Sequence, residues 1–423
     1  MKQKVYCMKK IVYTALFLLS SAVPVLASGF RMHEFSATNT GRALAGSGVA
    51  GDDYSAIGFN PAGMVLKGTG GQVSGSLVTI RANVRGSVTN GGLHTGKEGN
   101  IRLYSFLPSV FSQYALNPDW TIGLGIYTPF GLSTTYNNDW FGHTHALTSK
   151  LETIDFAPSV AYKVNKQFSV GGSVLFERLD VRLSNDLPSS IGPFPLGGQA
   201  EIHEPRNWEP GYVVGMMYQP LDSTRFGLSY RSKIVHHLKG TTKISDSAGL
   251  MGVYYVNGKY VTHAKLTLPE SVLFSIHHRI NEKFDVSATV ERVMWSRFKS
   301  LDIYSATFPG GVSVTPEKWR DVWFVSLGGD YHYNEDLTFR IGAAYDESPI
   351  KGPKYRTARI PDNDRYWLSA GASYRWNNMT FDLAYTHMFL KKAPTNNYAS
   401  ASMLDASYHM QVNIFALQVQ YDF

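Results

Sequence analysis

Hydrophobic and polar positions alternate with a period of two from about residue 71 to the end of the chain. In the stretch RYWLSAGASYRW (365–376), one face carries aromatic residues at both ends and small apolar residues between them: Tyr366, Leu368, Ala370, Ala372, Tyr374 and Trp376. The other face is mostly polar. Successive side chains of a strand point to opposite faces, and an apolar band between two aromatic girdles is typical of a lipid-facing strand. The pattern therefore predicts an all-β, transmembrane β-barrel.

Short polar turns and long irregular connections alternate along the same region. The six short turns lie near residues 117–119, 165–167, 221–223, 281–283, 334–336 and 377–378. The seven longer stretches lie near residues 86–103, 132–150, 184–203, 240–260, 302–317, 349–362 and 393–407. Short turns on one side of the membrane and long loops on the other are the pattern of bacterial outer-membrane barrels. These connections join fourteen antiparallel strands, an even number that lets the last strand close against the first.

The final stretch VNIFALQVQYDF (412–423) is itself an amphipathic strand, and it ends on Phe423. Order usually fades at a chain end, so regular alternation up to the last residue predicts a strand that closes the barrel. Outer-membrane barrels resemble one another in ending on an aromatic residue that the barrel insertion machinery reads, and Phe423 occupies that position. A soluble β-sandwich also alternates, but it does not explain the aromatic girdles or the two-sided loop lengths.

Residues 1–27 have the features of a secretory signal peptide. The stretch MKKIVYTALFLLSSAVPVLA (8–27) has two lysines, an apolar run and small residues before an expected cleavage after Ala27. The start codon is that of Met1 or of Met8. The apolar run is short for a membrane anchor. Cys7 is the only cysteine of the chain, so the mature protein is expected to have no disulfide and no thiol chemistry.

Removal of this leader changes the electrostatic picture. Four lysines and no acidic residue lie within it, so the net charge falls from +7 to +3. A charge this small is a poor argument for nucleic-acid binding, and we expect no nucleic-acid partner. Beyond the leader, no apolar run approaches the ~20 residues of a membrane helix. The composition thus leaves two classes, a soluble exported β protein and an outer-membrane barrel.

Residues 28–70 do not follow the strand pattern and precede the barrel domain of residues 71–423. They are rich in Gly, Ala and Ser but carry large apolar side chains: Phe30, Phe35, Tyr54, Ile57, Phe59 and Met64. Because a disordered tail would leave these side chains in water, we predict a compact helical hatch that plugs the lumen of the wide barrel. Pro61 fixes φ and lacks an N–H, so Asn60, Pro61 and Ala62 are expected to form a rigid turn or a helix start.

Several stretches also carry a family resemblance that runs in order from Ser28 to Phe423. They are SGFRMHEFSATNTGRALAGSG (28–48), NPAGM (60–64), KLETIDFAPSVAYKVNKQFSVGG (150–172), LTLPES (266–271), WSRFKSL (295–301), TFRIGAAYDESPI (338–350) and IPDNDRYWLSAGASY (360–374). This set resembles the FadL-type outer-membrane transporters of long-chain fatty acids. The resemblance implies a fourteen-stranded barrel with an N-terminal hatch, which agrees with the strand count reached from the loop pattern.

The resemblance also implies a function and a route. Family members take up hydrophobic compounds through a pocket above the hatch and release them sideways beside a kinked third strand. That strand lies near residues 119–131 here, where Gly123, Gly125, Pro129 and Gly131 weaken ladder pairing. These four residues also fit the alternative of ordinary strand-end residues. Uptake of long-chain fatty acids is the first hypothesis, with aromatic hydrocarbons as alternative substrates.

Two arginines occupy positions where, by resemblance, the family carries basic residues that meet a ligand carboxylate. Arg320 shares a strand face with the polar positions of the tenth strand, and Arg178 shares a face with Asp180 and Arg182 on the fifth strand. This sharing predicts that both arginines point into the lumen. Phe176 shares the face of Arg178, with a possible bulge nearby, and Phe30 is expected to touch the ligand pocket. A structural role as lumen-lining arginines paired with acids remains an open alternative.

Other chemistry finds weaker support in the sequence. No Gly-x-Ser-x-Gly elbow accompanies the histidines and serines, so we expect neither an enzyme nor a cofactor. The pair His143 and His145, with Asp139 nearby, leaves a loop metal site open, although we predict no metal. An adhesin-type structural barrel and a diffusion porin are the remaining rivals. The expected partners are a hydrophobic ligand, outer-membrane lipid and the insertion machinery, and we expect a monomer.

Overall fold

The computed structural model describes residues 29–89, 98–187, 190–191, 194–195, 198–247, 256–399 and 402–423. The expected signal peptide, with Cys7 and the cleavage position, lies outside these residues. A search of the described part of the chain for helices long and apolar enough to cross a membrane finds none.

Two sheets contain the strands, which a few short helices accompany. The first half of the chain contributes β1 (Gly70–Thr89), β2 (Gly99–Ala115), β3 (Trp120–Tyr127), β4 (Gly131–Thr135), β5 (Thr148–Lys163), β6 (Phe168–Asp186), β7 (Ser190–Ile191), β8 (Phe194–Pro195), β9 (Gln199–Leu221) and β10 (Thr224–Arg231). The second half contributes β11 (Ile234–Ser245), β12 (Gly258–Leu268), β13 (Ser271–Arg279), β14 (Phe284–Val293), β15 (Ser300–Ser305), β16 (Val312–Pro316), β17 (Val322–His332), β18 (Leu337–Asp346), β19 (Arg365–Trp376), β20 (Met379–Leu390), β21 (Ala393–Ala399) and β22 (Ser402–Asp422). The helices are α2 (Ala37–Gly41), α3 (Ala56–Phe59), η1 (Pro61–Leu66), η2 (Trp295–Arg297), η3 (Pro309–Gly311) and η4 (Pro353–Tyr355).

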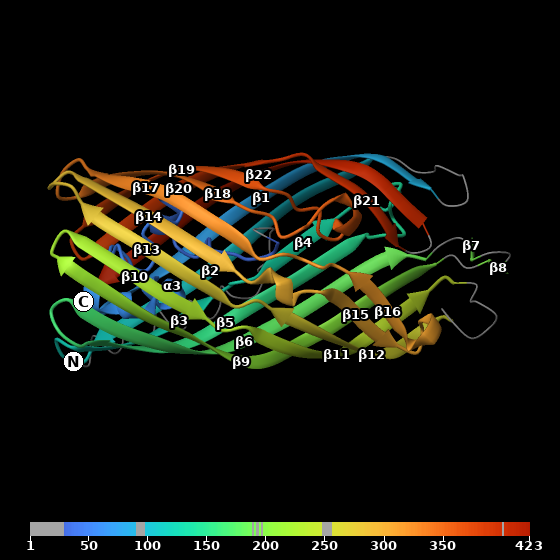
Figure 1. The fold of residues 1–423 in the computed structure, drawn as a ribbon, viewed down its shortest axis with the longest axis horizontal. Coiled ribbons are helices and arrows are strands. Elements are labelled where there is room, and N and C mark those ends of the chain that lie inside the picture. The colour runs from blue at the N-terminus through green and yellow to red at the C-terminus, as the bar shows by residue number, and fades with distance from the viewer. Residues whose placement is uncertain are drawn as a thin grey trace.

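Twenty of the strands form one antiparallel sheet, and β7 pairs with β8 in a small hairpin outside it. Six barrel strands are broken once along their length, so the described residues build a closed barrel of fourteen antiparallel strands. The last strand, β22, pairs with β1 from Gly70–Asp422 to Thr89–Met403. The predicted fold class and closure are therefore confirmed. Figure 1 shows the tilted strands of this barrel, with the chain's C-terminus at the end that carries the short turns.

The short turns share one local device. The side-chain oxygens of Asn117, Asn165, Asn281 and Asn334 each accept hydrogen bonds from the backbone N–H groups two and three residues later, at 2.7–3.0 Å. An Asn side chain that bonds the following backbone in this way stabilises a tight turn. The recurring asparagine is thus the physical reason that these connections stay short.

Outward-facing and inward-facing positions follow the predicted alternation on β19. The side chains of Tyr366, Leu368 and Tyr374 are exposed, whereas Trp367 and Ser369 are buried. Several long stretches that the sequence suggested as loops are instead strand. Both β6 and β9 extend into the stretch predicted as loop at 184–203, and β21 with β22 fills most of 393–407. The strands therefore continue beyond the membrane toward the loop end.

The hatch lies inside the barrel at the short-turn end, where α3 is labelled in Figure 1. Ser36 caps α2 by accepting a hydrogen bond from the N–H of Asn39. Two ion pairs attach the hatch to the wall: Arg42 lies 2.7 Å from Asp330 of β17, and Asp52 lies 3.1 Å from Arg340 of β18. Within the hatch, Arg42 also lies 2.7 Å from Asp52. Because Arg42 is fully buried, these contacts hold the plug firmly against β17 and β18.

Candidate functional site

The third strand of the barrel is broken next to β2. The segment β3 ends at Tyr127, and β4 starts at Gly131. Whereas β3 pairs with both of its neighbours, β2 and β5, β4 pairs along its length with β5. On the side that faces β2, the isolated bridge between Ile101 and Tyr136 is the one pairing among the described residues. The ladder that closes the wall between β2 and the third strand is thus interrupted, and we call this interruption the wall break.

The start of the hatch is bonded to the wall break. Arg31 and Phe130 form an antiparallel bridge, in which the N–H of Gly131 donates to the carbonyl of Phe30 and the N–H of Met32 donates to Pro129, each at 2.8 Å. Backbone groups that a kink removes from the sheet must find other partners. Here the segment 29–32 supplies them, so the kink and the hatch start form one unit.

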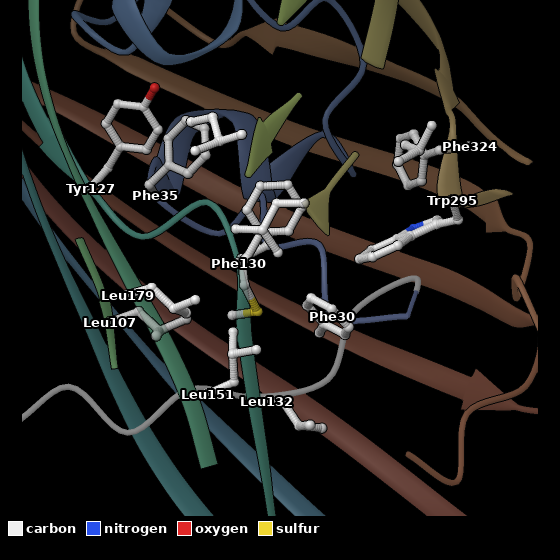
Figure 2. Packing of buried hydrophobic residues seen from close by; sticks show 14 of the residues in the cluster. Phe30, Phe35, Leu107, Tyr127, Phe130, Leu132, Leu151, Leu179, Trp295 and Phe324 are labelled. Carbon is white, nitrogen blue, oxygen red and sulfur yellow. The ribbon is translucent and has the colours of Figure 1, made fainter. Parts of the chain in front are cut away.

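Phe30 lies in an aromatic cluster that surrounds this unit. Its ring centre is 4.6 Å from that of Trp295, 5.6 Å from Trp319 and 6.0 Å from Phe298. Figure 2 shows Phe30 beside Trp295, with Phe130 of the kinked strand close to both. Edge-to-face contacts of this kind add to the stabilisation that burial provides. The cluster therefore fixes where the hatch start sits in the lumen.

An apolar cavity opens above Phe30, and side chains from many barrel strands line it. Its apolar wall consists of Phe30, Leu132, Leu151, Val181, Leu183, Ile202, Leu238, Ala264, Leu266, Phe298, Leu301, Ile303 and Ile360. The free space is about 50 Å³, whereas pockets for organic ligands measure roughly 300–1,000 Å³. The cavity is thus closed down around Phe30 in this conformation, and an acyl chain fits only after side chains or the hatch start move.

Three ionisable side chains also line the cavity: Glu204, Glu317 and Arg359. The guanidinium of Arg359 donates to neutral oxygens, among them Asn185 Oδ1 at 2.8 Å and Ser149 Oγ at 3.1 Å. Burial lowers the pKa of Arg359 to about 10, which still leaves it protonated at neutral pH. Burial also raises the pKa of Glu317 to about 8, so its carboxyl is neutral there. Arg359 is accordingly the charged group that an anionic ligand would meet.

Glu204 is the least expected of the three. Its side chain is 2% exposed, and neither carboxyl oxygen has a hydrogen-bond partner among the residues that the structure describes. Glu317, in contrast, has a hydrogen-bond partner, because the indole N–H of Trp319 donates to its Oε2 at 3.0 Å. A buried polar group without a partner is costly. Glu204 is therefore a polar group that a hydrogen-bond donor on a ligand would satisfy.

The predicted positions of Arg178 and Phe176 in the lumen are wrong. On β6 the inward positions are odd: Glu177, Leu179 and Val181 are buried, whereas Phe176 is 46% exposed on the opposite face. Arg178 shares that outer face. The sequence argument assumed that polar residues face the lumen, but from Leu179 toward the loops the lumen side of β6 is apolar and its outer side is polar. The ladder irregularity lies between Leu179 and Val181 on the β9 side, close to the predicted bulge.

Arg320 is also outside the lumen. Its guanidinium lies 3.1 Å from Glu347, and its side chain is 44% exposed. Residues 317–321 are not strand, and Lys318 has a positive φ of 49°, so the alternation of β17 does not extend back to Arg320. The buried residue at this point is its neighbour Trp319. Arg320 therefore matches the structural alternative, an arginine paired with an acid, but on the outer surface.

The four residues predicted at the lateral opening divide into two pairs. Pairing with β2 and β5 continues through Gly123 and Gly125, so the predicted weakening of the ladder there was wrong. A Cβ at Gly123 would lie 2.6 Å from Met64 of the hatch, and one at Gly125 would lie 2.9 Å from Ile57. These glycines make room for the plug. Pro129 and Gly131, in contrast, lie at the wall break itself.

The motif Asn60–Pro61–Ala62 lies where the hatch meets the wall. Pro61 is the first residue of η1, and the side-chain oxygen of Asn60 accepts a hydrogen bond from the N–H of Ala62 at 3.2 Å. The side-chain amide of Asn60 donates to the carbonyl of Met216 on β9 at 3.1 Å. The predicted helix start is present, and it also attaches the hatch to the barrel.

Charged groups flank the wall break on two sides. Arg231 lies 2.8 Å from Asp155 and 2.8 Å from Glu177. Arg31 of the hatch start lies 3.2 Å from Glu291, which also contacts His33 at 2.6 Å. Both guanidinium groups approach the ring of Phe130, at 5.1 Å for Arg31 and 5.7 Å for Arg231. The kink is thus held by side chains as well as by backbone bonds.

The loop histidines have separate partners. His143 Nδ1 lies 2.8 Å from Asp186, and His145 Nε2 lies 2.9 Å from the hydroxyl of Ser402. Within the described ranges, no group of three or more His, Cys, Asp or Glu side chains is arranged to hold a metal ion.

Comparison with known proteins places the chain. The sequence model of the outer membrane protein transport family OMPP1/FadL/TodX matches residues 18–423. The chain belongs to this family. A long-chain fatty acid transport protein of Salmonella typhi is 28% identical over 410 residues, covering 92% of this chain and 93% of that protein. Outer membrane protein P1 of Haemophilus influenzae is 27% identical over 422 residues, with 89% and 90% covered. The outer-membrane location predicted from the sequence is confirmed.

Solved structures agree with the fold. The crystal structure of a FadL homologue from Pseudomonas aeruginosa has a TM-score of 0.86 and 27% identity, covering 93% of this chain and all of that one. A toluene transporter of Ralstonia pickettii has a TM-score of 0.67 at 20% identity, with 92% and 98% covered. The second likeness concerns the fold alone.

Sequence reasoning missed Arg359 of the cavity wall and the tryptophans that pack around Phe30. Arg359 lies between η4 and β19 in a stretch without periodicity, so no pattern could place its side chain. Trp295 and Trp319 occupy breaks between strands, where alternation gives no direction. The motif WSRFKSL, which begins at Trp295, was noted only for its family resemblance. A large aromatic residue at the start of this motif was the available signal that Trp295 packs in the interior.

Proposed function

We propose that this protein carries hydrophobic compounds, above all long-chain fatty acids, across the bacterial outer membrane. The relatives from Salmonella typhi and from Escherichia coli are named long-chain fatty acid transport proteins, and each aligns over more than nine tenths of both chains. The observation that carries the proposal is local. One segment, residues 29–32, both closes an apolar cavity and bonds the wall break.

Burial energy explains both capture and the need for release. Each buried CH₂ contributes ~0.8 kcal/mol, so a long acyl chain gains on the order of 10 kcal/mol. The same gain would trap the ligand in a rigid cavity. A transporter of this kind therefore needs a part that moves between the bound and the released state.

The hatch start is the part that we propose to move. The cavity holds about 50 Å³, far less than the roughly 300–1,000 Å³ of pockets for organic ligands. Phe30 fills the remaining space, and few bonds hold its segment: the two backbone bonds to the kink, the N–H of Gly29 to Asp362 at 3.0 Å, and Arg31 to Glu291. Withdrawal of Phe30 enlarges the cavity and frees the backbone of the kink, which offers a path sideways between β2 and β4.

Arg359 supplies the recognition of an acid in this scheme. A carboxylate that reaches it gains charge-assisted hydrogen bonds of about 1.5–3 kcal/mol each. Glu317 does not compete, because its carboxyl is neutral at pH 7. The acyl chain supplies most of the affinity, and Arg359 orients the ligand. An uncharged aromatic hydrocarbon would use the cavity without Arg359.

We propose transport rather than catalysis or adhesion, and a monomer as the working unit. An adhesin-type barrel has no need of a closed apolar cavity, and a diffusion porin has no need of a plug. The role of Phe423 in recognition by the insertion machinery stays a prediction, although its N–H donates to the carbonyl of Thr69 at 2.9 Å.

A disulfide across the bridge Arg31–Phe130 tests the moving part. Bonds at the flanking residues make this a non-hydrogen-bonded antiparallel pair, whose Cα atoms lie roughly 4.5 Å apart and suit a disulfide. With Cys7 in the leader, the double variant Arg31→Cys/Phe130→Cys has no competing thiol. Its reduced form controls for the lost side chains. Fatty acid uptake should stop on oxidation and return on reduction in cells that lack their own transporter. Equal uptake in both states would refute the moving segment.

A further inference from the structure

A basic pocket lies on the outer surface of the barrel and shares no lining residue with the apolar cavity. Arg81 of β1, Arg102 of β2, His409 of β22 and Lys392, which follows β20, line it, and its volume is about 350 Å³. All four side chains are exposed. Among the described residues, no Asp or Glu lines this pocket. It therefore concentrates positive charge without an internal counterion.

The strand register places like charges opposite each other. Arg81 pairs directly with Arg102 across β1 and β2, and Asn83 pairs with His409 across β1 and β22. Like charges directly opposite on neighbouring strands destabilise a sheet. An anion between two guanidinium groups reverses this effect, because each arginine can donate two parallel hydrogen bonds to a phosphate.

Several other cations toward the loop end have carboxylate neighbours. Arg85 lies 3.3 Å from Glu98, Arg297 lies 2.6 Å from Glu270, and Lys391 lies 3.0 Å from Asp364. On the basic hairpin β11–β12, His237 lies 3.6 Å from Glu209, and Lys243 pairs across to Glu201 of β9. The pocket on β1, β2 and β22 differs from these surfaces because nothing in its lining balances the charge.

The height of the pocket matches the headgroup layer of the membrane. Four residues closer to the short turns on the same outer face, Leu77 is exposed and pairs with Phe106 and Phe415. Tyr104, exposed, lies between the two levels. Four residues of a tilted strand rise roughly 10 Å, so Arg81 and Arg102 lie just above the aromatic girdle. This is the side of the long loops, which face outward in outer-membrane barrels.

We propose that this pocket binds a phosphate group of lipopolysaccharide, the phosphorylated glycolipid of the outer leaflet. Its phosphates lie at the level of the pocket, and charge complementarity selects them over neutral headgroups. The acyl chains of the same molecule then lie along the apolar outer faces of β1 and β22. The wall break adjoins Arg102, because the preceding residue, Ile101, forms the bridge to Tyr136. The bound glycolipid thus stands beside the side path of the barrel.

Native mass spectrometry of the detergent-purified, full-length mature protein tests this site. The probe is bis-phosphorylated lipid A, compared with phosphatidylglycerol, and inorganic phosphate serves as a competitor. The variant Arg81→Gln/Arg102→Gln should bind lipid A about tenfold or more weakly, the scale of losing hydrogen bonds to a charged group. Arg85→Gln is the matched control, because this arginine shares the strand and the outer face but has a carboxylate partner. It should bind lipid A like the unchanged protein.

Three results would overturn the proposal. They are undiminished lipid A binding by the double variant, equal loss in Arg85→Gln, and phosphatidylglycerol binding as tight as that of lipid A. Full displacement by millimolar inorganic phosphate would likewise reassign the pocket to a free anion. Thermal unfolding without lipid guards against a folding defect. Because the substitutions remove a like-charge pair, the melting temperature of the double variant should not fall.

Discussion

Along β6, the two halves of the barrel have opposite polarity. In the half near the short turns, the lumen is polar and the outside is apolar: on β6, Ser173 is buried and Val174 is 52% exposed. In the half near the long loops, the same strand has Leu183 buried and Arg182 exposed. The phase of the strand does not change between them. What changes is which side of the strand meets polar surroundings and which side meets apolar surroundings.

The exchange follows from where water is. Near the short turns the outer surface meets lipid, and the lumen holds the polar and charged attachments of the hatch. Above the membrane the outer surface meets water, while the lumen narrows to the cavity around Phe30. A chain that binds an apolar ligand above its plug must therefore invert the usual rule of outer-membrane barrels, in which the interior is polar. The inversion is the structural signature of the cavity.

The largest expected effect concerns the charged attachment of the hatch. Arg42→Met leaves Asp52 and Asp330 without their main cation in the polar half, and breaking a buried ion pair costs about 3–5 kcal/mol. The loss should lie at the low end, since Arg340 remains beside both acids. Chemical unfolding in detergent measures it. Arg182→Met, on the outer face of the other half, should stay within about 0.5 kcal/mol; equal losses would break the comparison.

The outer faces of the two halves should tolerate charge differently. Leu417, 68% exposed, faces lipid, so Leu417→Arg should cost about 2–4 kcal/mol near the midplane of the bilayer. Lys239 is exposed on the outer face near the loops, and Lys239→Leu should change stability by less than about 0.5 kcal/mol. Refolding into lipid vesicles gives both values. A neutral Leu417→Arg would mean that the lipid boundary is misplaced.

Truncation of inward side chains compares the two lumens. Leu183→Ala removes apolar contacts in the dry half and should cost about 2–3 kcal/mol, at the low end for buried leucine because free space already adjoins it. Ser173→Ala removes one hydrogen bond, to Ser159 at 2.6 Å, and should cost about 1 kcal/mol. The same unfolding experiment ranks them. The reverse order would contradict the assignment of the dry half.

The pH dependence of ligand binding is the smallest effect. Burial raises the pKa of Glu317 to about 8, so its carboxyl is neutral at pH 6.5 and ionised at pH 9. Ionisation places a negative charge beside Arg359, and the affinity for a fatty acid should fall by roughly threefold to tenfold, the scale of one partly screened charge. Isothermal calorimetry at both pH values measures the change. Glu317→Gln should remove part of it, whereas binding of a methyl ester should not depend on pH.

The sequence predicted the barrel well because its signal is repetitive. Alternation on β19, asparagine turns such as the one at Asn117, and the closing strand that ends at Asp422 each report local physics that short stretches determine. The hatch was predictable for a similar reason, since Phe35 and Phe59 could not remain in water. Their contact, with ring centres 4.5 Å apart, lies within the plug.

The site was harder to predict because alternation gives the phase of a strand but not its surroundings. Arg178 was assigned to the lumen from its polarity, and the surroundings reverse along β6 just at that residue. Arg359 and Trp319 lie outside regular strands, where no period exists to read. Phe30 was placed at the pocket by resemblance, and the structure puts its ring in the cavity wall; its role in binding stays a prediction.

Equilibrium binding of a long-chain fatty acid and of its methyl ester to Arg359→Gln and Arg178→Gln tests the central claim most directly. If the ligand lies in the dry half of the lumen with its carboxylate at Arg359, Arg359→Gln should bind the acid about tenfold or more weakly and the ester as before. Arg178→Gln, altered on the outer face, should bind both ligands like the unchanged protein. Loss of acid binding in Arg178→Gln with normal binding in Arg359→Gln would contradict the account and return the site to the outer face of β6.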